Sequence, residues 1–152
     1  MADYEALARG WFDLLHAREW TQVAARYAVE SNFLRSDGTS HGPEAHVTYL
    51  KRVLGAFPDH ASAIDSVLVA GSAVTVEWTE TGTHTEPYET SRFGTIPPTG
   101  QAFKAHIVEV SRFEGDEIVS QHEYYDLMTI AVQLGWLAAM MGGRTAEASA
   151  PV

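Results

Sequence analysis

The sequence predicts a single α+β domain, with N-terminal helices packed on a curved, mainly antiparallel sheet. Apolar residues recur at helical spacing over much of the first 60 positions, whereas apolar and polar residues alternate over most of residues 64–125. Helices and strands that occupy separate parts of a chain are typical of the α+β class. The 152 residues also suit one ordinary domain. We therefore expect one unit over residues 1–144 and a flexible C-terminal tail over residues 145–152.

Three helices are expected before the sheet. Apolar side chains from Tyr4 onward predict a first helix over residues 4–17, and a shorter second helix follows with Trp20 and Tyr27 on its apolar side. The third helix begins at Gly42-Pro43-Glu44, because proline suits the first helical turn and glutamate suits the positive end of the helix dipole. Pro58 helps to end this helix.

The sheet is expected to contain four strands. The first covers Ile64–Val69, and the second is the alternating run from Val74 to Trp78. Two longer strands, Phe103–Phe113 and Glu117–Tyr125, are joined by a tight turn at residues 114–116. A curved sheet closed on one side by helices has a concave interior that suits a small ligand.

The remaining segments are expected to connect or cover these elements. Asn32–Arg35 is a short apolar stretch ahead of a turn signal at residues 36–38. Residues 82–100 are polar, contain glycine and proline, and predict a lid or rim loop. A last helical stripe runs from Leu127 and ends at Gly142-Gly143.

The charge balance narrows the class of ligand. Ten Lys and Arg residues oppose twenty Asp and Glu residues, for a net charge of -10. Nucleic acid and anionic membrane surfaces require clustered cations, so neither is expected as a partner, and a neutral or cationic ligand is the simpler expectation. The chain has no cysteine, no zinc-ligand spacing, no signal-peptide pattern and no phosphate-binding or dinucleotide motif. We expect a cytoplasmic protein without a metal or cofactor.

Several segments of the chain resemble the SnoaL-like polyketide cyclase family of the nuclear-transport-factor-two-like superfamily. The resemblance spans about residues 4–136 and rests on these segments: Phe57-Pro58-Asp59, Gly82-Thr83-His84-Thr85, Ile96-Pro97-Pro98-Thr99-Gly100, Arg112-Phe113-Glu114-Gly115-Asp116-Glu117-Ile118, Asp126-Leu127 and Gln133-Leu134-Gly135. It implies a cone-shaped fold with a deep hydrophobic cavity, and a homodimer or higher homo-oligomer. A superfamily of this breadth does not define one reaction.

The resemblance also implies a catalytic pair on the two long strands. The family's catalytic His and Asp positions fall on Glu109 and Glu123, and a neighbouring Gln position falls on Ile107. Burial and like charge would raise the pKa of one carboxyl, giving one base and one proton donor. Alternation alone leaves open whether the face of Gln121, Glu123 and Tyr125 looks into the cavity or into solvent. A single bulge would exchange the two faces.

The other candidate residues each have a structural alternative. His84 is either a polar contact or proton donor at the rim, or a loop histidine bonded to backbone. Asp126 is a candidate acid, although its place before Leu127 favours an N-cap. His41, His46 and His60 are expected to be surface or structural residues. The residues expected to line a substrate cavity are Ile107, Trp78, Phe33, Phe57, Tyr125 and Gln121.

The functional hypothesis is a cofactor-independent biosynthetic cyclase that binds a small hydrophobic organic substrate. Glu123 would remove a proton beside a carbonyl, and protonated Glu109 would donate to the developing enolate. Two alternatives stay open. The same scaffold and acids would also serve a dehydratase, an isomerase, a hydrolase or a tailoring hydroxylase. The second alternative is a non-catalytic module for small-ligand binding or dimerisation.

Overall fold

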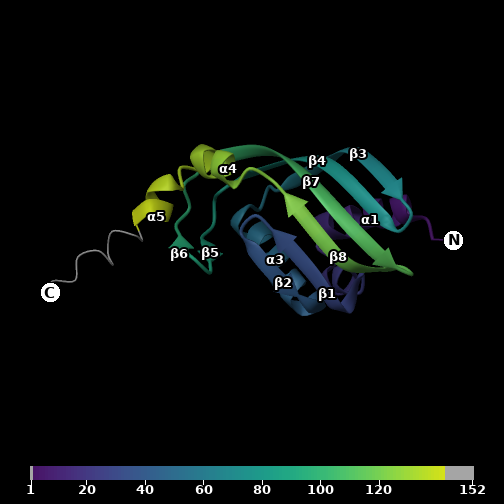
Figure 1. Ribbon diagram of the computed structural model, residues 1–152. Coiled ribbons are helices and arrows are strands. Elements are labelled where there is room, and N and C mark those ends of the chain that lie inside the picture. The colour runs from purple at the N-terminus through teal and green to yellow at the C-terminus, as the bar shows by residue number, and fades with distance from the viewer. Residues whose placement is uncertain (1, 143–152) are drawn as a thin grey trace.

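A computed structural model describes residues 2–142 of the chain (Figure 1). The expected tail over residues 145–152 and its boundary at residue 144 lie outside the described residues. The helices are α1 (Tyr4–His16), α2 (Trp20–Ala24), α3 (Gly42–Ala56), α4 (Leu127–Leu134) and α5 (Leu137–Gly142). The strands are β1 (Tyr27–Arg35), β2 (Gly38–His41), β3 (Ala61–Ala70), β4 (Ala73–Thr83), β5 (Tyr88–Thr90), β6 (Gly94–Ile96), β7 (Ala102–Glu114) and β8 (Glu117–Tyr124).

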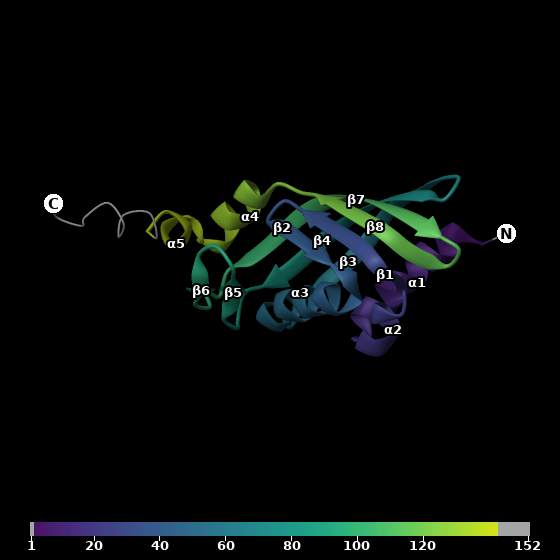
Figure 2. The ribbon, with the colours of Figure 1, turned by 60° about the horizontal axis from the view of Figure 1, so that its bottom comes forward.

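Six strands form one curved sheet in the order β2-β1-β8-β7-β4-β3. All neighbours are antiparallel except β1 and β8, the second and third strands of the sheet, which run parallel. Helices α1 and α3 pack on the inner face of the sheet, while β5, β6, α4 and α5 gather at the end away from the N-terminus (Figures 1 and 2). The predicted α+β fold, with helices on a curved and mainly antiparallel sheet, is confirmed.

Helix α1 supplies the apolar layer under the sheet. Trp11, Phe12 and Leu15 are buried on one side of the helix, and the Phe12 ring meets Trp78 of β4 edge to face with centroids 5.1 Å apart. Each such side chain contributes roughly 1.5–3 kcal/mol when it is removed from water. Asp3 caps the helix by accepting a hydrogen bond from the Ala6 amide at 3.0 Å. This layer is part of the hydrophobic core.

The first hairpin of the sheet differs from the sequence expectation. Tyr27 begins β1 instead of ending the second helix, and β1 extends far beyond the expected stretch at residues 32–35. Its inward positions include Ser31 and Arg35, which are buried but polar, so the strand lacks apolar alternation. The pairing of β1 with β2 also places strand structure where the sequence signalled only a turn.

Two further segments are more ordered than expected. The connection over residues 82–100 begins inside β4 and contains the small β5–β6 hairpin. The last helical stripe is broken at Gly135, whose φ of 70° ends α4 in a left-handed C-cap. No helix within residues 2–142 has the length and apolar character that a membrane crossing requires.

Candidate active site

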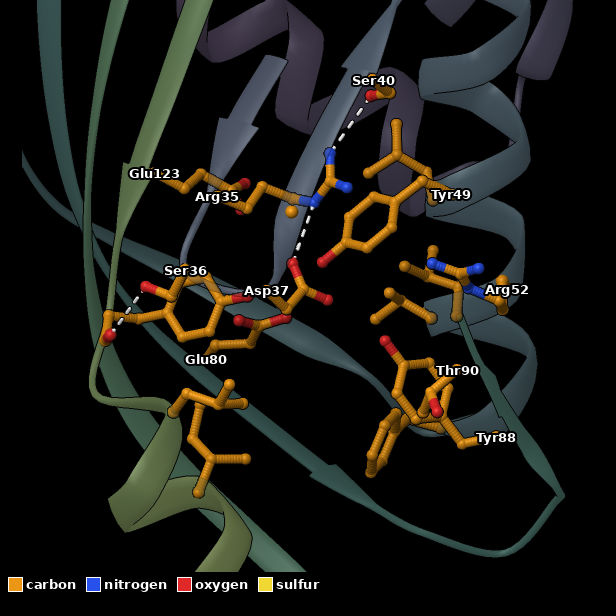
Figure 3. Close-up of a pocket in the computed structure, with 18 of the residues that line it drawn as sticks. Arg35, Ser36, Asp37, Ser40, Tyr49, Arg52, Glu80, Tyr88, Thr90 and Glu123 are labelled. Carbon is orange, nitrogen blue, oxygen red and sulfur yellow. Dashed lines mark hydrogen bonds and ion pairs between the residues drawn. The ribbon is translucent and has the colours of Figure 1, made fainter. Parts of the chain in front are cut away.

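A cavity of about 840 Å³ lies between the inner face of the sheet and helix α3, at the end covered by β5, β6 and α4 (Figure 3). Strands β4 and β7 supply Trp78 and Ile107 to its wall, and α3 supplies Tyr49. Its other large apolar or aromatic side chains include Phe57, Tyr88, Tyr125, Ile130 and Trp136. This volume lies within the range of pockets that enclose drug-sized molecules.

Glu123 and Glu109 are cross-strand partners in the β7–β8 pair. Glu123 is half-buried on the cavity wall. Glu109 is only 3% exposed and lies outside this cavity, in a small hollow shared with Ser111 and Gln121. The hydroxyl of Ser111 donates to Glu109 Oε1 at 2.7 Å, and Glu109 Oε2 has no hydrogen-bond partner among the described residues.

A bulge in β8 produces this pairing. The register changes between Phe113↔Ile118 and Arg112↔Ser120, so Val119 is left without a partner on β7. Without the extra residue, His122 would stand opposite Glu109. Because of it, Ile118 and Gln121 are both buried on the inner face, which simple alternation does not allow. The bulge therefore places the carboxyl of Glu123 inside the cone.

The two carboxyls have perturbed acidities. Burial raises the pKa of Glu109 to about 7, although the hydroxyl of Ser111 stabilises its ionised form. Burial also raises the pKa of Glu123 well above its usual range, and the neighbouring charge of Glu109 raises it further. Arg35 acts in the opposite direction on Glu123. Near neutral pH, the pair therefore retains a proton that solvent-exposed glutamates would have lost.

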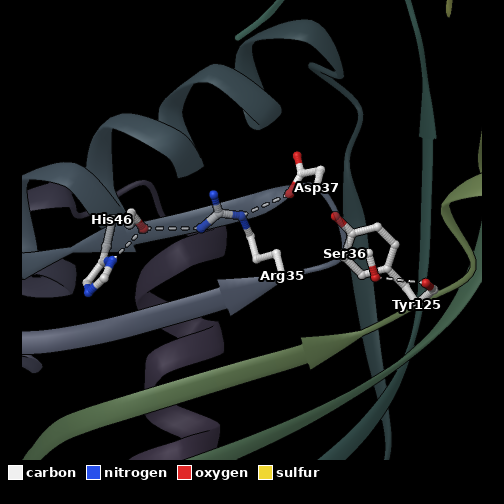
Figure 4. A network of polar contacts seen from close by, with 6 residues as sticks. Arg35, Ser36, Asp37, His46 and Tyr125 are labelled. Atoms are coloured by element: carbon white, nitrogen blue, oxygen red, sulfur yellow. Dashed lines mark hydrogen bonds and ion pairs between the residues drawn. The ribbon is translucent and has the colours of Figure 1, made fainter. Parts of the chain in front are cut away.

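Arg35 lies beside Glu123 because of the parallel β1–β8 pairing. Leu34 and His122 are register partners, and one residue further along the two strands lie Arg35 and Glu123. The Arg35 guanidinium is 3.6 Å from the centroid of the Tyr49 ring. Its Nε donates to Asp37 Oδ1 at 3.1 Å, which fixes the cation in the cavity wall (Figure 4).

A buried chain of hydrogen bonds continues behind Arg35. Its Nη1 donates to Ser40 Oγ at 3.1 Å, and Ser40 Oγ lies 2.7 Å from His46 Nδ1. The other ring nitrogen of His46 is 3.0 Å from Ser31 Oγ. Burial and, to a lesser extent, the nearby charge of Arg35 lower the pKa of His46 to about 4, so His46 is neutral at pH 7. The expected structural role for His46 agrees with this position.

His60 and Glu80 form a second polar pair on the cavity wall. A hydrogen bond joins His60 Nε2 to a carboxylate oxygen of Glu80. The other ring nitrogen of His60 is buried without a partner among the described residues. His60, which was expected to be a surface or structural residue, lines the cavity. Its partner is 20 residues away on β4, a distance at which no local sequence pattern indicates a pair.

Two predicted catalytic residues lie away from the cavity wall. His84 is completely buried, and its Nδ1 accepts from Trp136 Nε1 at 3.1 Å and from the Thr99 amide at 3.3 Å. It therefore orients Trp136, which does line the cavity, and it is not exposed at the rim. Asp126 is exposed and caps α4 by accepting from the amide and hydroxyl of Thr129, at 3.0 and 2.6 Å. The N-cap expectation describes Asp126 correctly.

Four of the six predicted cavity residues, Ile107, Trp78, Phe57 and Tyr125, line the cavity. Phe33 does not, because it lies fully buried behind Tyr49 with the ring centroids 6.0 Å apart. Gln121 lies in the hollow of Glu109 and accepts from the Tyr27 hydroxyl at 2.7 Å. The wall residues that sequence reasoning missed include five polar side chains: Arg35, Asp37, His60, Glu80 and Arg52.

The fold places the protein in a class shared with several solved structures. AclR of Streptomyces galilaeus, a proposed hydroxylase, is 23% identical with a TM-score of 0.75, covering 90% of this chain and 98% of its own. IdmH of Streptomyces antibioticus, a proposed polyketide cyclase, is 19% identical with a TM-score of 0.74, covering 88% and 99%. A Catenulispora acidiphila protein with a ketosteroid isomerase-like fold is 19% identical with a TM-score of 0.71, covering 87% and 94%.

The sequence itself identifies the family within this class. The family model for SnoaL-like polyketide cyclases matches residues 5–134, which is most of the chain. The protein therefore belongs to the SnoaL-like polyketide cyclase family, as the resemblance of its motifs implied. No curated protein matches the chain significantly.

Proposed function

We propose that the protein is a cofactor-independent cyclase that joins two carbons of a polyketide-like carbonyl substrate by acid–base chemistry. The observation that carries the proposal is Glu123, a half-buried carboxyl with a raised pKa on the wall of a largely apolar cavity. A raised pKa makes the ionised carboxylate a stronger base toward a carbon acid. Family membership supports the same class of reaction.

In the proposed reaction, ionised Glu123 removes a proton from a carbon next to a carbonyl group. The guanidinium of Arg35, which lies beside Glu123, stabilises the negative charge on the enolate oxygen. The enolate carbon then attacks a second carbonyl carbon of the same molecule and forms the new carbon–carbon bond. The resulting alkoxide takes the proton back from Glu123, so the ring closes without an added reactant.

Glu109 has a different part in this scheme from the one its sequence position suggested. Because it lies behind Glu123 and outside the large cavity, it does not reach a substrate carbonyl. We assign it as a positioning residue that acts through the pKa of Glu123. The apolar wall, including Trp78 and Ile107, holds the flexible substrate folded so that the reacting carbons meet, which is proximity catalysis.

The test replaces the base and a matched control on the same strand. Glu123→Gln should lower turnover by about 10²- to 10⁴-fold, the usual worth of a general base, while circular dichroism and thermal unfolding show an intact fold. Glu117→Gln alters an exposed glutamate of β8 outside the cavity and should retain activity. The test substrates are polyketide-like ring systems with an uncyclised β-dicarbonyl side chain. Full turnover by Glu123→Gln would exclude this role for the residue.

The mass of the product distinguishes the proposed cyclisation from the other reactions that this scaffold would support. An aldol closure leaves the mass unchanged and alters the ultraviolet spectrum. Loss of water indicates a dehydratase, and gain of one oxygen atom indicates a hydroxylase. Tight binding without turnover at any pH would instead indicate a ligand-binding module.

A further inference from the structure

Arg52 is a cation on the cavity wall without an acidic partner. The side chain extends from α3 and is half-buried, with its guanidinium 5.5 Å from the centroid of the Tyr49 ring and 5.9 Å from that of Tyr88 (Figure 3). Within residues 2–142 it forms no ion pair, and its buried Nε has no hydrogen-bond partner. An unpartnered buried donor is costly and is usually satisfied by another group.

Four acidic side chains line the cavity, Asp37, Glu44, Glu80 and Glu123, and among the described residues none forms an ion pair with Arg52. Asp37 pairs with Arg35, and Glu80 is bound to His60. Glu123 retains its proton more readily than an ordinary glutamate. Burial raises the pKa of Tyr88 to about 12, so its phenol is neutral although Arg52 lies close by. Arg52 therefore has an unbalanced positive charge, in a chain whose net charge is -10.

A carboxylate is the ligand group that fits this environment. Its two oxygens match the planar fork of a guanidinium, and such bidentate pairs are among the strongest hydrogen-bonded contacts in proteins. The rings of Tyr49 and Tyr88 flank the cation and offer apolar surface to the body of the same ligand. Partial exclusion of water by these rings strengthens the attraction between the charges.

We propose that Arg52 binds the carboxylate of a small organic acid whose ring system occupies the apolar cavity, with its carbonyl groups toward Glu123. This assignment replaces the expectation of a neutral or cationic ligand, which rested on the net charge alone. The net charge describes the whole surface, whereas three of the chain's ten basic side chains, Arg35, Arg52 and Arg92, line this cavity. The inference rests on the proposed function in placing the substrate in this cavity.

The test compares a charged probe with a neutral one of nearly the same shape. Anthraquinone-2-carboxylate and its methyl ester are titrated against the protein by calorimetry. The wild type should bind the acid more tightly than the ester. Arg52→Gln should weaken binding of the acid by about 10- to 100-fold, the range for a hydrogen bond to a charged group, and leave binding of the ester unchanged. Arg52→Lys keeps the charge but loses the planar fork of donors, so its affinity for the acid should lie between those of the wild type and Arg52→Gln.

The matched control is Arg112→Gln, which removes the same charge from an exposed position of β7 outside the cavity. It should leave the binding of both probes unchanged. Equal loss of acid binding in Arg112→Gln and Arg52→Gln would overturn the proposal, because it would indicate a long-range field effect. A wild type that does not prefer the acid would also overturn it, as would an Arg52→Gln variant that weakens both probes equally. If Arg52→Gln fails to fold, Arg52→Lys decides the question by the same preference for the acid.

Because binding can be measured without turnover, the carboxylate site can be tested separately from the proposed reaction. Glu123→Gln lacks the base but keeps Arg52, so it should still bind the acid more tightly than the ester. If the preference is present and no cyclisation is found, the carboxylate site stands and the proposed reaction fails. If cyclisation occurs without the preference, the reaction stands and the carboxylate site fails.

Discussion

Replacing Glu109 by glutamine should make the protein more stable at alkaline pH. The folded-state pKa of this carboxyl is about 7, against an ordinary value of 4.5. Between these two values the folded state holds a proton that the unfolded chain releases, so the free energy of unfolding falls as the pH rises. This shift in pKa corresponds to about 3 kcal/mol in the free energy of unfolding, and that contribution is lost in full once the pH exceeds 7. Glutamine keeps the contact with Ser111 without a titrating group.

The measurement is urea unfolding of both proteins at pH 4 and pH 8. The two should have similar stability at pH 4, whereas Glu109→Gln should exceed the wild type at pH 8 by up to about 3 kcal/mol. In the same variant, loss of the neighbouring charge should lower the pKa of Glu123 and move the acid limb of kcat/KM to lower pH. Glu117→Gln should change neither measurement. A variant less stable than the wild type at pH 8 would refute the assigned cause of the shift.

The remaining predictions concern stability at three other positions. Gly82→Ala should lower the free energy of unfolding by about 1–3 kcal/mol, because a Cβ there would lie 3.1 Å from Phe103 and 3.2 Å from Phe57. Gly55 lies in open space on α3, so Gly55→Ala should instead raise the free energy of unfolding by about 0.5–1 kcal/mol. Relative to the wild type, the urea unfolding midpoint should therefore fall in Gly82→Ala and rise in Gly55→Ala. Asp126→Ala should cost about 1 kcal/mol through loss of the α4 cap, and an unchanged midpoint would contradict that role.

The sequence predicted the fold class because its main signals are local. The long strand β7 alternates clearly, and the Glu114-Gly115-Asp116 turn specifies its hairpin with β8. Simple counting back from that turn would pair Glu109 with His122. The bulge at Val119 shifts the partner to Glu123, and no feature of the sequence marks that residue as unpaired. The family resemblance identified Glu123 as a site residue where alternation alone could not.

The polar half of the site could not be predicted from periodicity. Ser31 and Arg35 occupy buried positions of β1, so their polarity removed the apolar pattern that would have identified the strand. Arg35 meets Glu123 only through a parallel pairing between segments almost ninety residues apart. Arg52 is one of several charged residues on α3, and only the position of the cavity distinguishes it from Lys51, which is exposed.

The parallel β1–β8 pair also has a consequence during synthesis of the chain. Strand β1 leaves the ribosome early, but the neighbour that it needs, β8, is among the last segments to follow. Until then, β1 pairs on one side only with the short β2, and its other edge is open to association with other nascent chains. Contacts of such long sequence separation form slowly. Arg35 and Glu123 therefore come together only when translation is nearly complete, and a shortened chain that ends before β8 would lack both the complete sheet and the proposed site.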